Sequence, residues 1–86
     1  MAIPIAARRK VLHAAGAVTC NSRRESAIVG AICRSMIETG TLQPPFVRAW
    51  IGSAMGLTPA ERQPPDLAEL AQIVARFEEA FGRRVA

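Results

Sequence analysis

Few residues in this chain could perform acid–base, nucleophilic or metal chemistry. It has one histidine (His13), two cysteines (Cys20 and Cys33), one aspartate (Asp66) and no tyrosine. A nucleophile activated by its neighbour could be built from Cys20 and His13, but no third group is placed to orient the imidazole. Together with Cys33 they match no zinc-binding spacing. We therefore expect a protein that is not an enzyme and that holds neither a metal nor a cofactor.

Clustered basic residues could instead contact phosphate groups. The net charge is +4, and it is uneven, because residues 1–48 carry +5 while residues 49–86 carry −1. Basic side chains that gather on one surface neutralise nucleic-acid phosphates, and a hairpin of the first two predicted helices could gather them. The alternative for each basic residue is that its charge is solvated at the surface and contacts no phosphate. The candidate phosphate contacts are Arg8, Arg9, Lys10, Arg23, Arg24, Arg83 and Arg84.

The elements that must position these residues are helical. No stretch alternates apolar and polar residues with period two, whereas several show helical spacing, and 86 residues form one domain. The fold class is therefore all-α, a compact bundle spanning 1–86. We expect helices at 4–15, 23–39, 45–55 and 66–81, a short helical turn at 59–63, and flexible ends at 1–3 and 83–86.

Capping signals set these boundaries. Ser22 and Glu25 form a capping box before the second helix, and glycines are expected to end the helices, at Gly16, Gly40, Gly56 and Gly82. The second helix has the broadest apolar face, with Cys33 as a buried small residue, and we expect it to be the core. Gly30 in its interior predicts the close approach of another helix.

The predicted helix 45–55 lies between two Pro-Pro pairs and is apolar over nearly its whole circumference. We expect one side to face helix 23–39 and the other to face helix 66–81, which closes the far side, or a partner. Aromatic, Arg and Met side chains are frequent interface anchors, although Trp50 filling the core is an equal alternative. The candidate partner-binding residues are Phe46, Arg48, Trp50, Met55 and Leu57.

A helix-turn-helix reading of the second and third helices is disfavoured. A helix that recognises bases presents several long polar side chains to the major groove. The helix 45–55 offers only Arg48 and Ser53. Sequence-specific DNA recognition by this helix is therefore not expected.

These observations favour a small interaction protein that binds and modulates a partner protein, or a second copy of itself, through an apolar helical surface. Its basic flanks suit an acidic partner. The alternative is a DNA- or RNA-binding accessory protein that uses the basic N-terminal half.

No segment has the length of a membrane span, and two cysteines make no disulfide framework, so we expect a cytoplasmic protein. Its small size is typical of accessory proteins of phages and plasmids.

Overall fold

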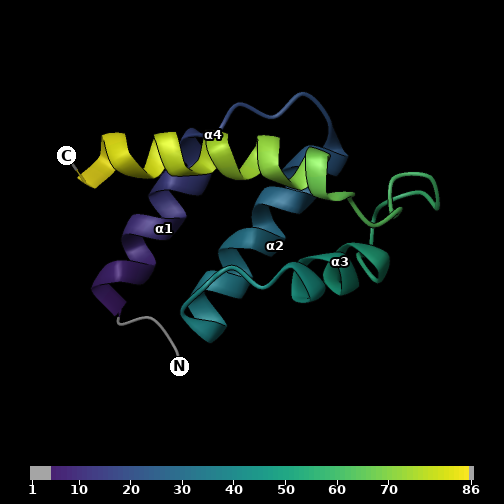
Figure 1. The fold of residues 1–86 in the computed structure, drawn as a ribbon, viewed down its shortest axis with the longest axis horizontal. Helices are drawn as coiled ribbons and strands as arrows, with labels where there is room; N and C mark the ends of the chain where they lie inside the picture. Colours follow the sequence, from purple (N-terminus) through teal and green to yellow (C-terminus); the bar gives the residue numbers. More distant parts are fainter. Residues whose placement is uncertain (1–4, 86) are drawn as a thin grey trace.

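Four helices form the regular structure of the described part of the chain. A computed structural model describes the backbone of residues 5–85 and the side chains of residues 9–80. The helices are α1 (Ile5–Ala17), α2 (Arg23–Thr39), α3 (Pro44–Gly52) and α4 (Leu67–Val85). Figure 1 shows α4 crossing the molecule along its long axis, with α1 and α3 toward opposite ends. The predicted all-α class is confirmed. Within the described range, no helix is long and apolar enough to cross a membrane.

The second helix has the bounds that its capping residues predict. The Ser22 hydroxyl accepts a hydrogen bond from the Glu25 N–H (3.1 Å), and the Asn21 N–H donates to the Glu25 carboxylate (3.1 Å). At the other end Gly40 takes the left-handed conformation (φ 83°), and its N–H donates to the Met36 carbonyl (2.9 Å). Only glycine adopts this conformation at little cost, which is why α2 ends here.

The predicted end of α3 at residue 55 is wrong, because the helix stops at Gly52. The Ser53 hydroxyl donates to the carbonyls of Ala49 and Trp50, at 3.1 and 3.3 Å. A serine that bonds back to the last turn satisfies carbonyl groups that a longer helix would have used. Gly56 has a positive φ of 86° as predicted, but it lies in the following turn and caps no helix.

Two other glycines do not end their helices as predicted. The first helix passes through Gly16 by one residue, and α4 continues through Gly82 to its end, so residues 83–85 are helical. A glycine within a helix costs about 1 kcal/mol relative to alanine but does not stop the helix by itself. The expected flexible ends at 1–3 and at residue 86 lie outside the described residues.

The core forms around α2, as predicted. This helix contacts α1, α3 and α4, and α1 also packs against α4. Burial of apolar side chains from all four helices supplies the main stabilising free energy. The buried apolar residues are Val11, Ala14, Ile28, Val29, Ala31, Ile32, Cys33, Val47, Ile51, Leu70, Ile73, Phe77 and Ala80.

The packing of α3 differs from the prediction. This helix buries Val47 and Ile51 against α2, but among the described residues it makes no helix–helix contact with α4. The expectation that α4 closes the far side of α3 is therefore wrong. The chain between α3 and α4 is long enough for α4 to pack on the other side of α2, against α1. As a result, much of the apolar circumference of α3 is left without a helix to cover it.

A buried serine fixes the turn between α2 and α3. Ser35 is 0% exposed. Its hydroxyl donates to the Thr41 carbonyl (3.0 Å) and accepts from the Gln43 N–H (2.9 Å). Because both partners are backbone groups of the connecting turn, this side chain ties the turn that precedes α3 to α2. The Thr39 hydroxyl adds a second bond to the same Thr41 carbonyl (2.8 Å).

Arg24 holds the segment before α4 against the start of α2. Its Nε and Nη2 donate to the two carboxylate oxygens of Glu69, at 3.0 and 2.6 Å. Its Nη1 donates to the carbonyls of Glu61 and Gln63. This segment contains the predicted turn at 59–63, present as one turn in which the Arg62 N–H donates to the Thr58 carbonyl (3.0 Å).

A second link joins α2 to α4 through Glu25. The pKa of Glu25 is held below its ordinary value. The larger cause is the hydrogen bond from the Asn21 N–H, and the second is the Arg76 guanidinium, 3.2 Å from the carboxylate. The same Arg76 donates to the Thr19 carbonyl (2.8 Å). These bonds tie the α1–α2 loop and the start of α2 to the middle of α4.

Candidate functional site

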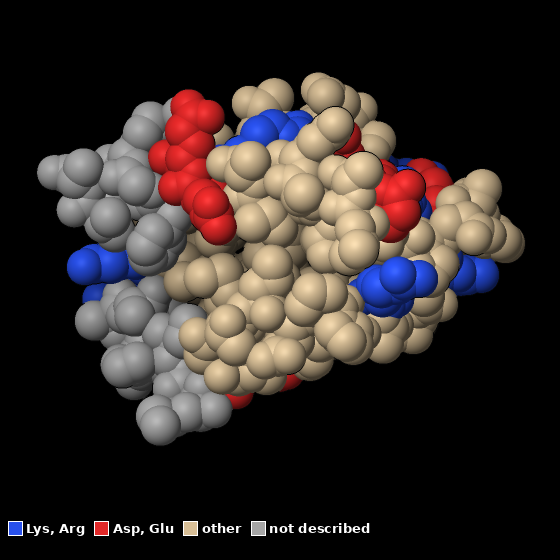
Figure 2. All heavy atoms as spheres, viewed as in Figure 1, with Lys and Arg blue, Asp and Glu red and all other residues tan. Residues whose placement is uncertain are grey.

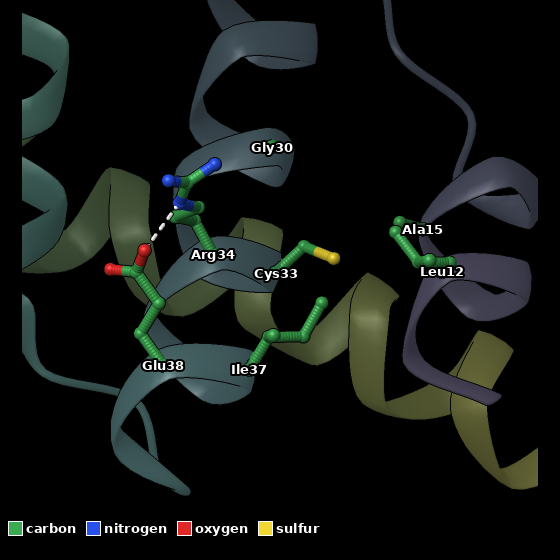
Figure 3. A pocket seen from close by; sticks show the side chains of 7 residues that line it. All are labelled: Leu12, Ala15, Gly30, Cys33, Arg34, Ile37 and Glu38. Atoms are coloured by element: carbon green, nitrogen blue, oxygen red, sulfur yellow. Dashed lines mark hydrogen bonds and ion pairs between the residues drawn. The ribbon is translucent and has the colours of Figure 1, made fainter. Parts of the chain in front are cut away.

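One face of α2 is left open between its neighbours. In Figure 3, α1 lies on one side of α2 while α4 passes behind it, and α3 packs against α2 from another side. The stripe of α2 between these neighbours includes half-buried Ala27 and exposed Gly30 and Arg34, which recur at the helical spacing of three and four residues. We call this surface the α2 groove. Its residues are Leu12 and Ala15 of α1, Ala27, Gly30, Cys33, Arg34, Ile37 and Glu38 of α2, and Trp50, Ser53, Ala54 and Met55.

The part of the groove next to α1 is a hollow of about 630 Å³. Leu12 of α1 is 55% exposed there, and it lies across from Cys33 and Ile37 of α2 (Figure 3). Burial raises the pKa of the Cys33 thiol above its ordinary value, so this side chain stays protonated and contributes apolar surface. The hollow is therefore mainly apolar, with charge only at the Arg34–Glu38 edge.

Gly30 is an exposed residue of α2 that lines this hollow. A Cβ atom added to Gly30 would have nothing within 4 Å. The expectation that another helix of the chain approaches it closely is therefore wrong among the described residues. The space that a packed helix would use is open at this position.

The part of the groove next to α3 is a second hollow, of about 470 Å³. Ala27 of α2 lines it, together with Trp50, Met55 and their neighbours Ser53 and Ala54. Trp50 is 41% exposed and Met55 is 96% exposed. Two large apolar side chains are thus presented to solvent beside the open stripe of α2.

Arg34 lines the first hollow and contacts Trp50, which lines the second. Its guanidinium lies over the Trp50 ring, 5.2 Å from the ring centroid, a cation–π geometry. The Trp50 ring also stacks on Phe46 with 6.1 Å between centroids and 10° between planes. The Nε of Arg34 donates to the Glu38 carboxylate (2.7 Å), as the dashed line in Figure 3 shows. These contacts restrict the orientation of the indole.

The candidate partner-binding residues do not all lie together. Phe46 and Trp50 stack, and Met55 lies beside Trp50. Arg48 is two positions from Trp50, which places it on the opposite side of α3, and it is exposed there. Leu57 is half-buried beyond the end of α3. The expected site therefore keeps two members in the groove, Trp50 and Met55, with Phe46 stacked on Trp50, and Arg48 faces elsewhere.

Sequence reasoning missed the α1 and α2 residues of the groove, above all Leu12, Gly30 and Arg34. A signal for them existed, because Ala27, Gly30 and Arg34 fall on the one stripe of α2 without large apolar residues. Which side of α2 each neighbour covers could not be taken from that pattern. The exposure of Leu12 depends on which side of α2 helix α1 covers.

The candidate phosphate contacts are dispersed. Figure 1 shows α1 and α2 running in opposite directions, and in Figure 3 Ala15 and Gly30 lie toward one end of the hollow and Leu12 and Ile37 toward the other. This direction places Arg9 and Lys10 toward the end of α2, away from Arg23 and Arg24 at its start. The predicted hairpin therefore separates the two basic groups, and Arg8, Arg83 and Arg84 have side chains outside the described range.

The individual environments of these basic residues also differ. Arg23 pairs with Glu61 at 3.0 Å, and the donors of Arg24 are taken by Glu69 and backbone carbonyls. The Glu69 hydrogen bond is the main cause that raises the pKa of Arg24. Figure 2 shows the basic side chains of the visible face separated by uncharged and acidic atoms. Among the candidate phosphate contacts whose side chains the structure describes, only Arg9 and Lys10 are exposed and form no ion pair with another described residue.

No cluster with metal-binding geometry occurs among the described residues: no three His, Cys, Asp or Glu side chains come together there. Cys33 is buried, as predicted, and Cys20 is half-buried in the α1–α2 loop, where its thiol lies 3.7 Å from the Val18 carbonyl. His13 is exposed on α1.

Comparisons with protein-family models, with curated proteins and with solved structures give no match to this chain. A function for the α2 groove therefore has to be argued from its own residues.

Proposed function

We propose that this chain is a small, non-enzymatic interaction protein that binds and modulates another protein through the α2 groove and the exposed side of α3. The observation that carries the proposal is the exposure of Trp50 and Met55 beside an open stripe of α2. Scattered exposed apolar residues are common on soluble proteins, whereas apolar residues that adjoin a hollow are typical of interaction sites.

The chemistry of these side chains suits protein binding. Tryptophan is enriched among the residues that contribute most to binding free energy, and methionine adapts its shape to different partner surfaces. The contacts of Trp50 with Arg34 and Phe46 restrict the indole in advance, which lowers the entropy lost on binding. The exposed basic residues favour association with an acidic surface.

The test is affinity capture of partner proteins by the full chain, with nuclease treatment, compared among three forms. The double variant Trp50→Ala/Met55→Ser removes the exposed apolar side chains, while Leu67→Ser is the matched control. Leu67 is 72% exposed on α4 and lies outside the groove. We expect a nuclease-resistant partner that the control retains and the double variant loses. Equal capture by all three folded forms contradicts the proposal.

The second candidate is nucleic-acid binding by the N-terminal half. Exposed Arg9 and Lys10, which have no ion pair among the described residues, favour it. Phosphate contacts are strongest at low salt, so binding to random DNA and RNA is measured there by fluorescence anisotropy. Loss of binding in Arg9→Gln/Lys10→Gln would support this candidate. No binding by the unchanged chain excludes it.

A further inference from the structure

A separate pocket lies between α2, the turn that follows it and α4. Its volume is about 350 Å³, which is within the range of small-molecule sites, and such sites commonly lie between the helices of a bundle. It shares no lining residue with the α2 groove. The lining residues are Ile32, Met36, Gly40, Thr41, Leu42, Val74, Phe77 and Glu78.

The walls of this pocket are apolar and belong to the packed part of the fold. Ile32 and Phe77, which are 1% and 2% exposed, are core residues. The half-buried side chains of the wall pack against that core, and they are Met36, Leu42 and Val74. The turn that contains Leu42 is tied to α2 by the two hydrogen bonds of the buried serine. The pocket therefore offers an apolar ligand a surface whose position the fold already fixes.

Glu78 is the one charged residue among those that line the pocket. Its side chain is exposed, and it forms no ion pair with another described residue. The nearby Arg76 of α4 donates instead to the Glu25 carboxylate and to the Thr19 carbonyl. The Glu78 carboxylate can therefore pair with a positively charged group of a ligand.

The end of α2 has the same preference for positive charge. Gly40, which caps this helix, lines the pocket, and the last turn of α2 contains no basic residue. The C-terminal end of a helix carries a partial negative charge that favours cations. The carboxylate and the helix end thus both favour a cation over an anion at this pocket.

We propose that this pocket binds a small apolar molecule that carries one ammonium group. The apolar body packs against Ile32, Val74 and Phe77, and the ammonium group pairs with the Glu78 carboxylate. An anionic molecule of the same shape would place its charge beside Glu78 and the end of α2, so it should bind less well. This binding site goes beyond the proposed function, because it lies outside the α2 groove and requires no partner protein.

The experiment compares three small probes that share one ring and differ in charge: cyclohexylmethylamine, cyclohexylmethanol and cyclohexanecarboxylate. Each is titrated into the full chain at neutral pH and followed by NMR of the methyl groups. The methyl groups of Leu12 and Ile37 report on the α2 groove. Those that report on the pocket belong to Ile32, Met36, Leu42 and Val74.

Two variants test the role of the carboxylate. Glu78→Gln removes the charge at the pocket and keeps the size of the side chain. Glu79→Gln is the matched control, because it makes the same change at the next position of α4, where the residue lines a different hollow. Both positions are exposed, and circular dichroism verifies that both variants fold.

We expect the amine to shift the methyl signals of the pocket saturably, with a Kd of about 1 mM for a molecule this small. It should bind at least about threefold more tightly than the alcohol, and the carboxylate should bind most weakly. In Glu78→Gln the amine should lose its advantage over the alcohol, whereas Glu79→Gln should keep it.

Several results would overturn this inference. They are the absence of saturable shifts at the pocket with all three probes, shifts confined to the α2 groove, and equal or weaker binding of the amine relative to the alcohol or the carboxylate. A preference for the amine that survives in Glu78→Gln, or that is lost equally in Glu79→Gln, would also overturn it. The comparison of the three probes on the unchanged chain does not depend on either variant. None of these results bears on partner binding by the α2 groove.

Discussion

Replacing Gly30 with alanine should make the folded chain more stable. Glycine in a helix interior costs about 1 kcal/mol relative to alanine, because its backbone loses more conformational freedom on folding. That gain is usually reduced where the new methyl group collides with a neighbour. At Gly30 nothing lies within 4 Å of an added Cβ, so the full value should appear. We expect the free energy of unfolding to rise by about 1 kcal/mol.

Thermal and denaturant unfolding, followed by circular dichroism, measure this change. For a domain of this size, about 1 kcal/mol corresponds to a rise in Tm of roughly 4–8 °C. Gly40→Ala is the matched control with the opposite sign, since φ is 83° at Gly40 and an L-residue pays about 1–2 kcal/mol in the left-handed region. An unchanged or lower Tm for Gly30→Ala would refute the reasoning, because it would mean that Gly30 is in close contact with another part of the chain.

Three other substitutions test the links that hold α3 and α4 in place. Arg24→Ala should destabilise the fold by about 1–3 kcal/mol in urea unfolding, because the hydrogen bonds of a charged donor are lost; a loss below about 0.5 kcal/mol would contradict the role given to Arg24. Ser35→Ala should cost about 1–3 kcal/mol, since it leaves the Gln43 N–H without its acceptor, and unchanged stability would show that the turn does not depend on this hydroxyl. Glu25 has a lowered pKa in the folded chain, so its contribution is complete above its ordinary value of 4.5 and is lost as the pH falls through the folded pKa. The stability difference between the unchanged chain and Glu25→Gln should therefore be largest at neutral pH and shrink below about pH 4.5, and a difference that is constant with pH would refute this.

The bounds of α2 could be predicted because the signals are local. Ser22 and Glu25 contact backbone groups within four residues, and Gly40 supplies the one conformation that ends the helix. Such contacts depend on the nearby sequence alone. The end of α3 was less predictable, because Ser53 and Gly56 are both able to end a helix and the sequence does not rank them.

The arrangement of the helices around α2 could not be predicted. Three helices with broad apolar faces can pack in more than one order, and each order buries a similar apolar area. The observed order depends on contacts between residues far apart in the chain, such as Arg24 with Glu69. The candidate site depends on this arrangement: Trp50 was identified from its residue type, but the open space at Gly30 could not be predicted without knowing which helices pack against each side of α2.

The measurement that tests the central claim most directly is the affinity of a captured partner, determined by calorimetry. It compares the unchanged chain with Trp50→Ala/Met55→Ser, and Leu67→Ser is the control. If the α2 groove and the exposed side of α3 form the binding surface, the double variant should lose at least about tenfold in affinity while the control keeps the original value. The opposite result, an unchanged affinity in the folded double variant, would show that the protein binds its partner through another surface.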